Sequence, residues 1–367
     1  MMKTFQHLID EVQTPGLCHH CGGCVTFCTA VNYGALILND KGMPSFGEKE
    51  KCIECGLCYS ICPEIDEMEE ETKEVCSWTP PIGRIMETHI ARAISDDIHK
   101  HATDGGVVTA ILLHLLERGH IDGAIVTRQT GPFSREPALA STPDEIINSA
   151  GFYFDSSHGI NHFSGQYSTF SPSVQEFRPM LQKGLRRIAL VGTPCQIKAV
   201  RRMETLGIVP SDSIKYCLGL FCSGNFTFGE PEKQQLEALG NFTWDQLLKV
   251  NVKDKLLIHL KDGSKKSIDL NKLDFMKRYA CHYCVDYSAE YADISFGGIG
   301  AEEGWTTVLT RSTLGRAVFA DAKDKTIQLL DYASNQNATT NALNIIREAS
   351  NAKAKKATQK RDALGKE

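Results

Sequence analysis

Two runs of four cysteines with the same spacing constrain this chain more than any other feature. In both runs the cysteines follow the pattern C-x₂-C-x₂-C-x₃-C, and a proline follows the second run. The first run contains Cys18, Cys21, Cys24 and Cys28, and the second contains Cys52, Cys55, Cys58 and Cys62. Three thiolates in one tight loop can each reach a different iron of a cubane, whereas structural zinc takes two separated Cys/His pairs. The repeat therefore predicts two iron–sulfur clusters.

This spacing is that of the bacterial two-cluster ferredoxin, in which the fourth cysteine of each run ligates the other cluster. One [4Fe–4S] cluster is expected to take Cys18, Cys21, Cys24 and Cys62, and the other Cys52, Cys55, Cys58 and Cys28. Thr29 replaces the proline that usually follows the first run, but proline is not a ligand. Between the runs, apolar residues flank Asp40-Lys41-Gly42, which predicts a short hairpin. The acidic stretch after Pro63 and the prolines at 80 and 81 indicate a linker, so we place the domain boundary near residue 82.

Composition limits the class of protein. A chain of 367 residues suits two domains and does not need disulfides, so its 14 cysteines favour metal or redox chemistry in a reducing compartment. It contains no run of roughly 18 apolar residues and no signal-peptide pattern at its start, so we expect a cytoplasmic protein. No basic stripe with interleaved aromatic residues points to nucleic acid.

From about residue 86 short apolar strands alternate with helical patterns, which predicts an α/β domain. We expect strands at 90–95, 121–128 and 188–191, and a helix over 107–120 with Asp104 as its N-cap. Glycine-rich turns before such helices can bind phosphate, although neither turn matches G-x-G-x-x-G and an ordinary turn would look similar. A hairpin around Asp262-Gly263 is interpreted as an insertion without a role in the chemistry.

Six cysteines lie outside the repeat. Cys281 and Cys284 have close-pair ligand spacing, and Cys195 lies at a strand-to-helix turn that would stabilise its thiolate. Cys217 and Cys222 are five residues apart on an extended segment and face opposite sides, so one of them is expected to be a ligand. We choose Cys222 because it ends the strand, and we interpret Cys217 as a buried apolar residue. Zinc bound by the same four cysteines is the alternative to a third cluster. The sixth cysteine, Cys76, is expected to be a free thiol.

An ordered series of motifs resembles the coenzyme F420 hydrogenase/dehydrogenase beta-subunit family over about residues 86 to 330. The motifs are Asp104-Gly105-Gly106-Val107-Val108-Thr109, IDGAIV, Gly192-Thr193-Pro194-Cys195-Gln196, GLFC ending at Cys222, Cys281-His-Tyr-Cys284, and DISFGGIG followed by GWTTV. With the ferredoxin module in front, the chain is also similar to input subunits of F420H2 dehydrogenases and to F420H2-oxidising modules of larger reductases.

The resemblance implies bound FAD and a third [4Fe–4S] cluster held by Cys195, Cys222, Cys281 and Cys284. The flavin contacts that it implies are Gly105, Gly106, Val107, Thr109, Thr193, Gln196, Gly297, Gly298, Trp305 and Thr306. Asp104 departs from the family, which often has serine or threonine there, and an acid would repel a pyrophosphate.

We therefore expect an α+β ferredoxin-like two-cluster domain with a linker over residues 1–82 and a larger α/β flavin-binding domain with the third cluster over 83–335. The basic segment 336–367 is expected to be a helical or mobile tail, and we favour mobility over docking on an electron acceptor.

The resemblance implies an oxidoreductase that takes a hydride from reduced coenzyme F420 onto FAD and passes single electrons through the clusters, in either direction. The cofactors do the chemistry, so no side-chain nucleophile is required. The expected partner is a reductase or hydrogenase complex, such as heterodisulfide reductase or a membrane electron-transport complex on which the protein would be peripheral. Two alternatives are an electron-transfer subunit without its own hydride-donor site and a reductase of another substrate, such as a modified tetrapyrrole.

Overall fold

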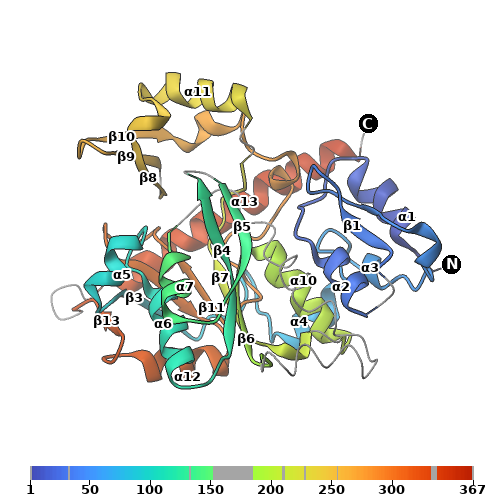
Figure 1. Ribbon diagram of the computed structural model, residues 1–367, viewed down its shortest axis with the longest axis horizontal. Coiled ribbons are helices and arrows are strands. Elements are labelled where there is room, and N and C mark those ends of the chain that lie inside the picture. Colours follow the sequence, from blue (N-terminus) through green and yellow to red (C-terminus); the bar gives the residue numbers. More distant parts are fainter. Residues whose placement is uncertain are drawn as a thin grey trace.

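The computed structural model describes residues 2–31, 34–131, 134–151, 185–208, 211–226, 229–253, 255–331 and 337–365. A small cysteine-rich unit lies beside a large sheet covered by helices, and a three-stranded sheet extends from the other side of the molecule (Figure 1). These parts correspond to a ferredoxin-like N-terminal domain followed by a larger α/β domain, as predicted.

The N-terminal unit is built from short elements around the two cysteine runs. Its helices and strands are α1 (Phe5–Leu8), α2 (Gly23–Val31), β1 (Leu36–Leu38), β2 (Pro44–Phe46) and α3 (Leu57–Ser60). Phe5, Phe27 and Ile61 form a small buried core between them. β1 and β2 pair antiparallel, and Gly42 takes the left-handed conformation (φ +69°) in the turn, which confirms the predicted hairpin.

The acidic stretch after the second cysteine run is a helix, so its interpretation as a linker was wrong. Helix α4 (Glu69–Val75) begins with three glutamates, which the positive end of the helix dipole stabilises. It packs against α10 (Pro194–Thr205) of the larger domain. The segment therefore belongs to the contact between the two domains.

The larger domain contains an eight-stranded mixed sheet in the order β13-β3-β12-β11-β7-β6-β4-β5. Its strands are β3 (Glu87–Ala93), β4 (Gly123–Gly131), β5 (Ser134–Ala140), β6 (Ile188–Gly192), β7 (Ile214–Leu220), β11 (Ile294–Gly297), β12 (Thr306–Thr310) and β13 (Ile327–Leu329). The four central strands β4, β6, β7 and β11 are parallel, and the outer pairings are antiparallel. The predicted strands at 90–95, 121–128 and 188–191 correspond to β3, β4 and β6.

Helices bury both faces of this sheet, as a parallel centre requires. They are α5 (Asp96–His101), α6 (Val107–Glu117), α7 (Pro143–Asn148), α10 and α12 (Thr313–Ala322). On β7, Leu218 packs into the core beneath α6 and α12, whereas its neighbour Cys217 packs with α10 on the other face. Successive strand residues thus serve opposite cores.

Helix α6 begins at Val107, as predicted, but its N-cap is Gly106 and not Asp104. Gly106 has φ +72°, and a Cβ there would lie 2.6 Å from the Ile98 side chain, so glycine fits both the conformation and the space. Asp104 instead accepts a hydrogen bond from Asn251 Nδ2 at 3.0 Å and pairs with Lys253 at 3.4 Å. This pairing neutralises the acid that departs from the family pattern.

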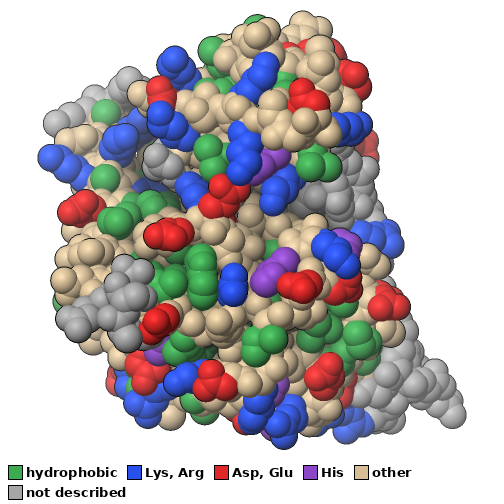
Figure 2. All heavy atoms as spheres, turned by 90° about the vertical axis from the view of Figure 1, so that its left-hand side faces the viewer, with side chains coloured by type: hydrophobic (Ala, Val, Ile, Leu, Met, Phe, Trp, Pro, Cys, Tyr) green, Lys and Arg blue, Asp and Glu red, His purple; other side chains and the backbone are tan. Residues whose placement is uncertain are grey.

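The predicted hairpin around Gly263 is confirmed as part of a small sheet of three antiparallel strands. They are β8 (Leu247–Val252), β9 (Lys255–Leu260) and β10 (Lys265–Asp269), and α11 (Glu230–Gly240) packs on them. Figure 2 shows the side of the molecule that lies on the left in Figure 1, with Lys and Arg side chains on its upper part, over the three-stranded sheet. Asn251 of β8 and Lys253, which directly follows the strand, are the partners of Asp104, so this sheet takes part in the site described below.

The C-terminal basic segment is a packed helix, and the expectation that it is mobile was wrong. Helix α13 (Ala338–Leu364) buries Ala342, Ile346, Ser350 and Ala357 along one side and runs from β3 to the N-terminal unit (Figure 1). Its abundant lysines concealed this apolar stripe in the sequence. Within the described ranges, none of the helices combines the length and apolar character that a membrane crossing requires.

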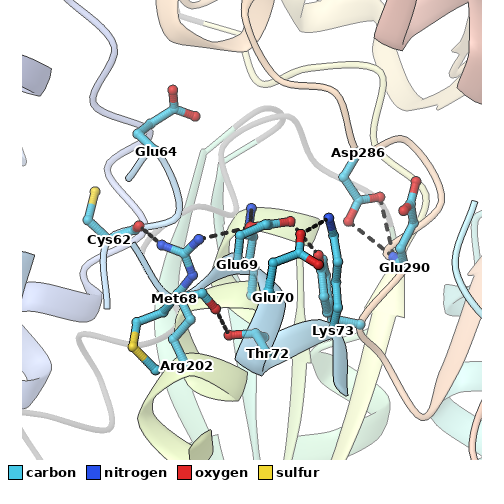
Figure 3. Close-up of polar contacts among 12 residues, drawn as sticks. Cys62, Glu64, Met68, Glu69, Glu70, Thr72, Lys73, Arg202, Asp286 and Glu290 are labelled. Carbon is cyan, nitrogen blue, oxygen red and sulfur yellow. Dashed lines mark hydrogen bonds and ion pairs between the residues drawn. The ribbon is translucent and has the colours of Figure 1, made fainter. Parts of the chain in front are cut away.

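A buried ion-pair network joins the two domains. Arg202 of α10 is fully buried, and its guanidinium donates to the backbone carbonyl of Cys62 and to Glu69 of α4 at 2.9 Å (Figure 3). Glu69 also pairs with Lys198 at 2.6 Å and accepts from the Tyr291 hydroxyl at 2.7 Å. Although burial acts to raise it, these partners hold the pKa of Glu69 down at about 2.

Replacing Arg202 should therefore destabilise the protein strongly. Arg202→Met leaves the carbonyls of the cysteine loop without their donor and removes one partner of a buried pair, which typically costs about 3 kcal/mol. Anaerobic urea unfolding would measure this loss. Lys100→Met, which breaks the exposed Lys100–Asp97 pair on α5, should leave the free energy of unfolding nearly unchanged. Equal effects of the two substitutions would contradict the network.

The same network predicts a pH dependence. A carboxyl whose folded pKa lies below its ordinary value stabilises the folded state above pH 4.5, and the stabilisation is lost as the pH falls toward 2. Glu69→Gln removes this contribution. The difference in unfolding midpoint between the wild type and Glu69→Gln should therefore be largest near neutral pH and should shrink below pH 4.5. A difference that stays constant from pH 7 to pH 3 would show that Glu69 titrates normally.

Candidate functional site

The structure sorts the eight cysteines of the repeat into two sets. One small cavity is lined by Cys18, Cys21, Cys24 and Cys62. A second is lined by Cys28, Cys52, Cys55 and Cys58. Each set takes three cysteines from one run and the last from the other, which is the crossed arrangement expected for two cubanes. We call them the first and the second cysteine set.

Burial raises the pKa of a cysteine in each of the two sets. It raises the pKa of Cys18 to about 11 and that of Cys58 to about 12, and neighbouring thiols add to the effect at both residues. These groups keep their protons at neutral pH unless a metal cation displaces them, because a bound cation inverts the local preference. The chemistry of four crowded thiols around one small cavity fits a [4Fe–4S] cluster in each set.

A third set forms where the larger domain meets the N-terminal unit. Cys195, at the start of α10, and Cys284 line a cavity of about 260 Å³. Cys222 and Cys281 lie close enough to Cys284 for the three thiols to interact electrostatically. Burial acts to raise the pKa of Cys281, but a hydrogen bond with His19 and the charge of that imidazole lower it to about 7. Across the described ranges, no three His, Cys, Asp or Glu side chains are arranged to hold one single metal ion.

The structure separates the two remaining cysteines from this third set. Cys217 is fully buried among apolar residues on the α10 face, and its backbone N–H donates to Asp293 at 2.8 Å. Cys76 caps the end of α4 and packs against the same core. Cys222 lies on the opposite side of the chain from Cys217, as the extended segment requires.

His19 connects the first and third sets. It follows Cys18 in the chain, lines the cavities of both sets, and hydrogen-bonds Cys281. Its other partner is the buried carboxylate of Glu64, with which it forms a short hydrogen bond. Glu64 also pairs with Arg361 of α13 at 2.6 Å. Sequence reasoning missed His19, although its position inside a cysteine run was a usable signal.

A cavity of about 320 Å³ lies at the carboxyl ends of the parallel strands. The ends of β6, β7 and β11 contribute Val191, Leu220 and Gly297 to its wall. In open α/β sheets this edge is where ligands bind. Its volume is in the range of small-molecule sites, and most of its walls are apolar.

Six of the ten residues predicted to contact a flavin line this cavity. They are Gly106, Val107, Thr109, Gly297, Gly298 and Thr306. Gly105 lies behind the wall, where its N–H donates to Thr306 Oγ1 at 3.0 Å. A Cβ on Gly298 would lie 2.4 Å from the Asp104 carboxylate, so this loop can pack closely only as glycine.

The other three predicted contacts point elsewhere. Thr193 and Gln196 form the N-terminal cap of α10, with the Thr193 N–H donating to Gln196 Oε1 at 2.9 Å. The Thr193 hydroxyl lies 3.3 Å from Cys195 Sγ, so this pair borders the third set. Trp305 packs its ring against Arg92, with 4.7 Å between the guanidinium carbon and the ring centroid.

Sequence reasoning missed several residues of the cavity wall, because they come from distant segments. Asn251 and Lys253 arrive from β8 and its end, in the region interpreted as an insertion, and Ala349 arrives from α13. Phe221, Ser223 and Tyr287 also line the wall, and the Cys222 N–H donates to the Tyr287 carbonyl at 2.8 Å. Cys222 is therefore a member of the third set that adjoins the cavity. Its neighbours Phe221 and Ser223 were the available signal.

The cavity suits an apolar ring system that carries an anionic group. Apolar side chains of the sheet and of α6 would cover the ring, and the N-terminus of α6, at Val107 and Val108, would attract phosphate. Lys253 adds a cation and offsets the charge of Asp104. These features fit a flavin nucleotide.

Three family models match the sequence. Two describe the coenzyme F420 hydrogenase/dehydrogenase beta subunit, one its N-terminal part (residues 88–163) and the other its C-terminal part (residues 185–334). The third is described as a 4Fe-4S dicluster domain (residues 11–63). The dicluster match covers both cysteine runs up to Pro63.

Similar proteins include components of known enzymes. The beta subunit of coenzyme F420 hydrogenase from Methanococcus voltae is 33% identical over 242 residues, which cover 65% of this chain and 81% of the relative. One component of the F420H2 dehydrogenase from Methanosarcina mazei is 28% identical over 333 residues, covering 86% of this chain and 85% of the relative. A chain of the F420-reducing [NiFe] hydrogenase complex from Methanosarcina barkeri superposes with a TM-score of 0.65 at 25% identity, covering 78% of this chain and 94% of that one.

The different surroundings of Cys217 and Cys222 predict different effects on metal content. Cys222→Ala should lower the iron content of anaerobically reconstituted protein by roughly four atoms per chain, the content of one [4Fe–4S] cluster. Cys217→Ala, a similar truncation five residues away, should leave iron and acid-labile sulfide unchanged. Zinc in place of iron in the wild type, or iron loss in Cys217→Ala alone, would contradict the assignment of the third set.

Proposed function

Because the chain belongs to the coenzyme F420 hydrogenase/dehydrogenase beta-subunit family and carries a 4Fe-4S dicluster domain, we propose that it oxidises reduced coenzyme F420 and delivers the electrons to a partner complex. FAD in the cavity at the sheet edge would accept the hydride, and three [4Fe–4S] clusters would carry its two electrons away one at a time. The proton of the hydride and the proton that reduced F420 loses as it gives up the hydride would both go to solvent. F420-linked oxidoreduction is common to the named relatives, and the reaction can run in reverse with a suitable partner.

One observation supports this proposal above all. The sheet-edge cavity and the three cysteine sets adjoin one another in series. Phe221 and Tyr287 of the sheet-edge cavity adjoin Cys222 of the third set. His19 then spans the third and first sets. Cys28 follows Cys24 on helix α2 and belongs to the second set, so that helix joins the first set to the second. A binding module for a single ligand would not need such a series.

The chain's own residues would hold, orient and shield the reactants. The apolar walls of the cavity would keep water from the reacting ring faces, which limits side reactions of the reduced rings such as proton leakage and oxidation. Phe296 and Leu220 are sheet residues on the wall and are therefore rigidly placed. The second set lies at the far end of this series from the cavity, and its Cys52 and Cys55 are partly exposed. The partner complex would receive electrons there.

The proposed partner is a reductase or hydrogenase complex. The relatives include one named for an F420H2 dehydrogenase and others named for an F420 hydrogenase. Another relative, coenzyme F420-dependent sulfite reductase of Methanocaldococcus jannaschii, is matched over 47% of its length, so that enzyme extends well beyond the part that resembles this chain. Heterodisulfide reductase and a membrane electron-transport complex are acceptors of the same class.

Anaerobic spectroscopy tests the proposal. The reconstituted chain with FAD should lose its flavin absorbance rapidly on addition of reduced F420 and show cluster reduction afterwards, with no comparable response to NADH or NADPH. A chain that binds FAD but is bleached by none of these donors would be an electron-transfer protein without a donor site. Bleaching by NADH or NADPH alone would assign another substrate.

A matched pair on α13 locates the flavin. Ala349 lines the sheet-edge cavity, whereas Ala352 on the same helix lies outside it. Ala349→Trp should fill part of the cavity and weaken FAD binding by about tenfold or more, and Ala352→Trp should bind FAD as the wild type does. Cluster content should stay the same in both variants. Equal FAD affinity in the two variants would place the flavin elsewhere.

A further inference from the structure

Helix α13 places one partly buried lysine against the third cysteine set. Lys353 Nζ donates to the backbone carbonyls of Cys222 and Asp286, each at 2.7 Å. The first carbonyl belongs to a member of the set, and the second lies two residues after Cys284. The ammonium is therefore fixed between two loops that carry cysteines of the set.

The surroundings of Lys353 favour a cation. Besides the two carbonyls, the ammonium lies near the thiols of Cys284, Cys222 and Cys281 and the carboxylate of Asp286. Lys277 is a second lysine near the thiols of Cys281 and Cys222. Lys353 is thus the cation of this pair that is anchored by hydrogen bonds to the cysteine loops.

The placement of α13 makes this contact part of a larger arrangement. Ala349 and Lys353 are four residues apart and lie on the same side of the helix, and Arg361 lies about two turns further along it. Ala349 borders the sheet-edge cavity, and Arg361 donates to the Tyr283 carbonyl at 2.9 Å and to Glu64 of the N-terminal domain. Along its length the helix therefore contacts the cavity, the third set and a neighbour of the first set in order.

Resting on the proposed function, we propose that Lys353 is a positioning residue that raises the reduction potential of the third cluster. Reduction adds one electron, and therefore one negative charge, to a cluster already surrounded by thiolates. A fixed cation in a buried, low-dielectric site stabilises the reduced form more than the oxidised form. With Lys353 beside it, the third cluster accepts an electron from the cavity side more readily than it would with its four thiolates alone.

Potentiometry on the complete reconstituted protein tests this inference. Lys353→Met removes the charge and the donor, Lys353→Gln removes the charge but keeps an N–H donor, and Lys353→Arg keeps both. Lys356→Met is the control, because Lys356 is exposed on the same helix. The signal of the third cluster in electron paramagnetic resonance is identified by its loss in Cys222→Ala, and its midpoint is read from a dye-mediated redox titration.

We expect both neutral variants to lower the midpoint of the third cluster. A change of about tenfold in the equilibrium between oxidised and reduced forms corresponds to about 59 mV for one electron. Lys353→Arg and Lys356→Met should keep the wild-type value, and the other two clusters should not shift in any variant.

Three results would overturn the inference. An unchanged midpoint in Lys353→Gln would show that the charge has no effect on the potential, and equal shifts of all three clusters would show a general structural change. Loss of the third cluster from both neutral variants would assign Lys353 to assembly of the site and not to its potential. Absence of the third cluster from the wild type would instead overturn the proposed function itself.

Discussion

Charges buried between the N-terminal domain and the large sheet need partners, and this requirement fixes how the two domains sit together. Removing charged groups from water is unfavourable unless each meets an opposite charge or a hydrogen-bonding group. Glu69 forms ion pairs with Lys198 and Arg202, and Arg202 in turn donates a hydrogen bond to the backbone carbonyl of Cys62. A second group joins His19, Glu64 and Arg361. The partners come from both domains, so neither network is complete unless the domains are docked.

This docking brings the cysteine sets into series. The first set and the third set belong to different domains, yet His19 borders the cavities of both. Helix α13 reinforces the same contact from outside, because it packs on the large domain and reaches Glu64 of the small one. Electron transfer between two sites requires that they stay close together. The ion pairs hold the two domains in this position, although none of their side chains takes part in the chemistry.

The sheet explains where the large cavity lies. The central strands are parallel, so their carboxyl ends meet at one edge, and the loops that follow them enclose the space. β7 leads directly from this edge to Cys222, and the loop with Tyr287 returns beside it. The third set is therefore adjacent to the cavity as a result of the topology. Arg311, which is buried and donates to the carbonyls of Ile82 and Ser288, fixes the entry of the chain into this domain against the same loop region.

The sequence by itself determined the features that depend on near neighbours. The spacing of the cysteines indicated two crossed sets, the alternation of strands and helices indicated the α/β domain, and Gly42 and Gly263 marked the two hairpins. The tertiary structure decided what depends on distant contacts. Asp104 pairs with Asn251 and Lys253 and does not cap a helix. The basic C-terminal segment is a packed helix, and Thr193 and Gln196 lie beside Cys195 and not in the cavity. Local patterns indicate conformational preference and amphipathic character. A charge such as that of Lys353, however, is stable in its place only because it meets carbonyls of residues more than sixty positions away in the chain. A linear pattern does not show which distant residues come together.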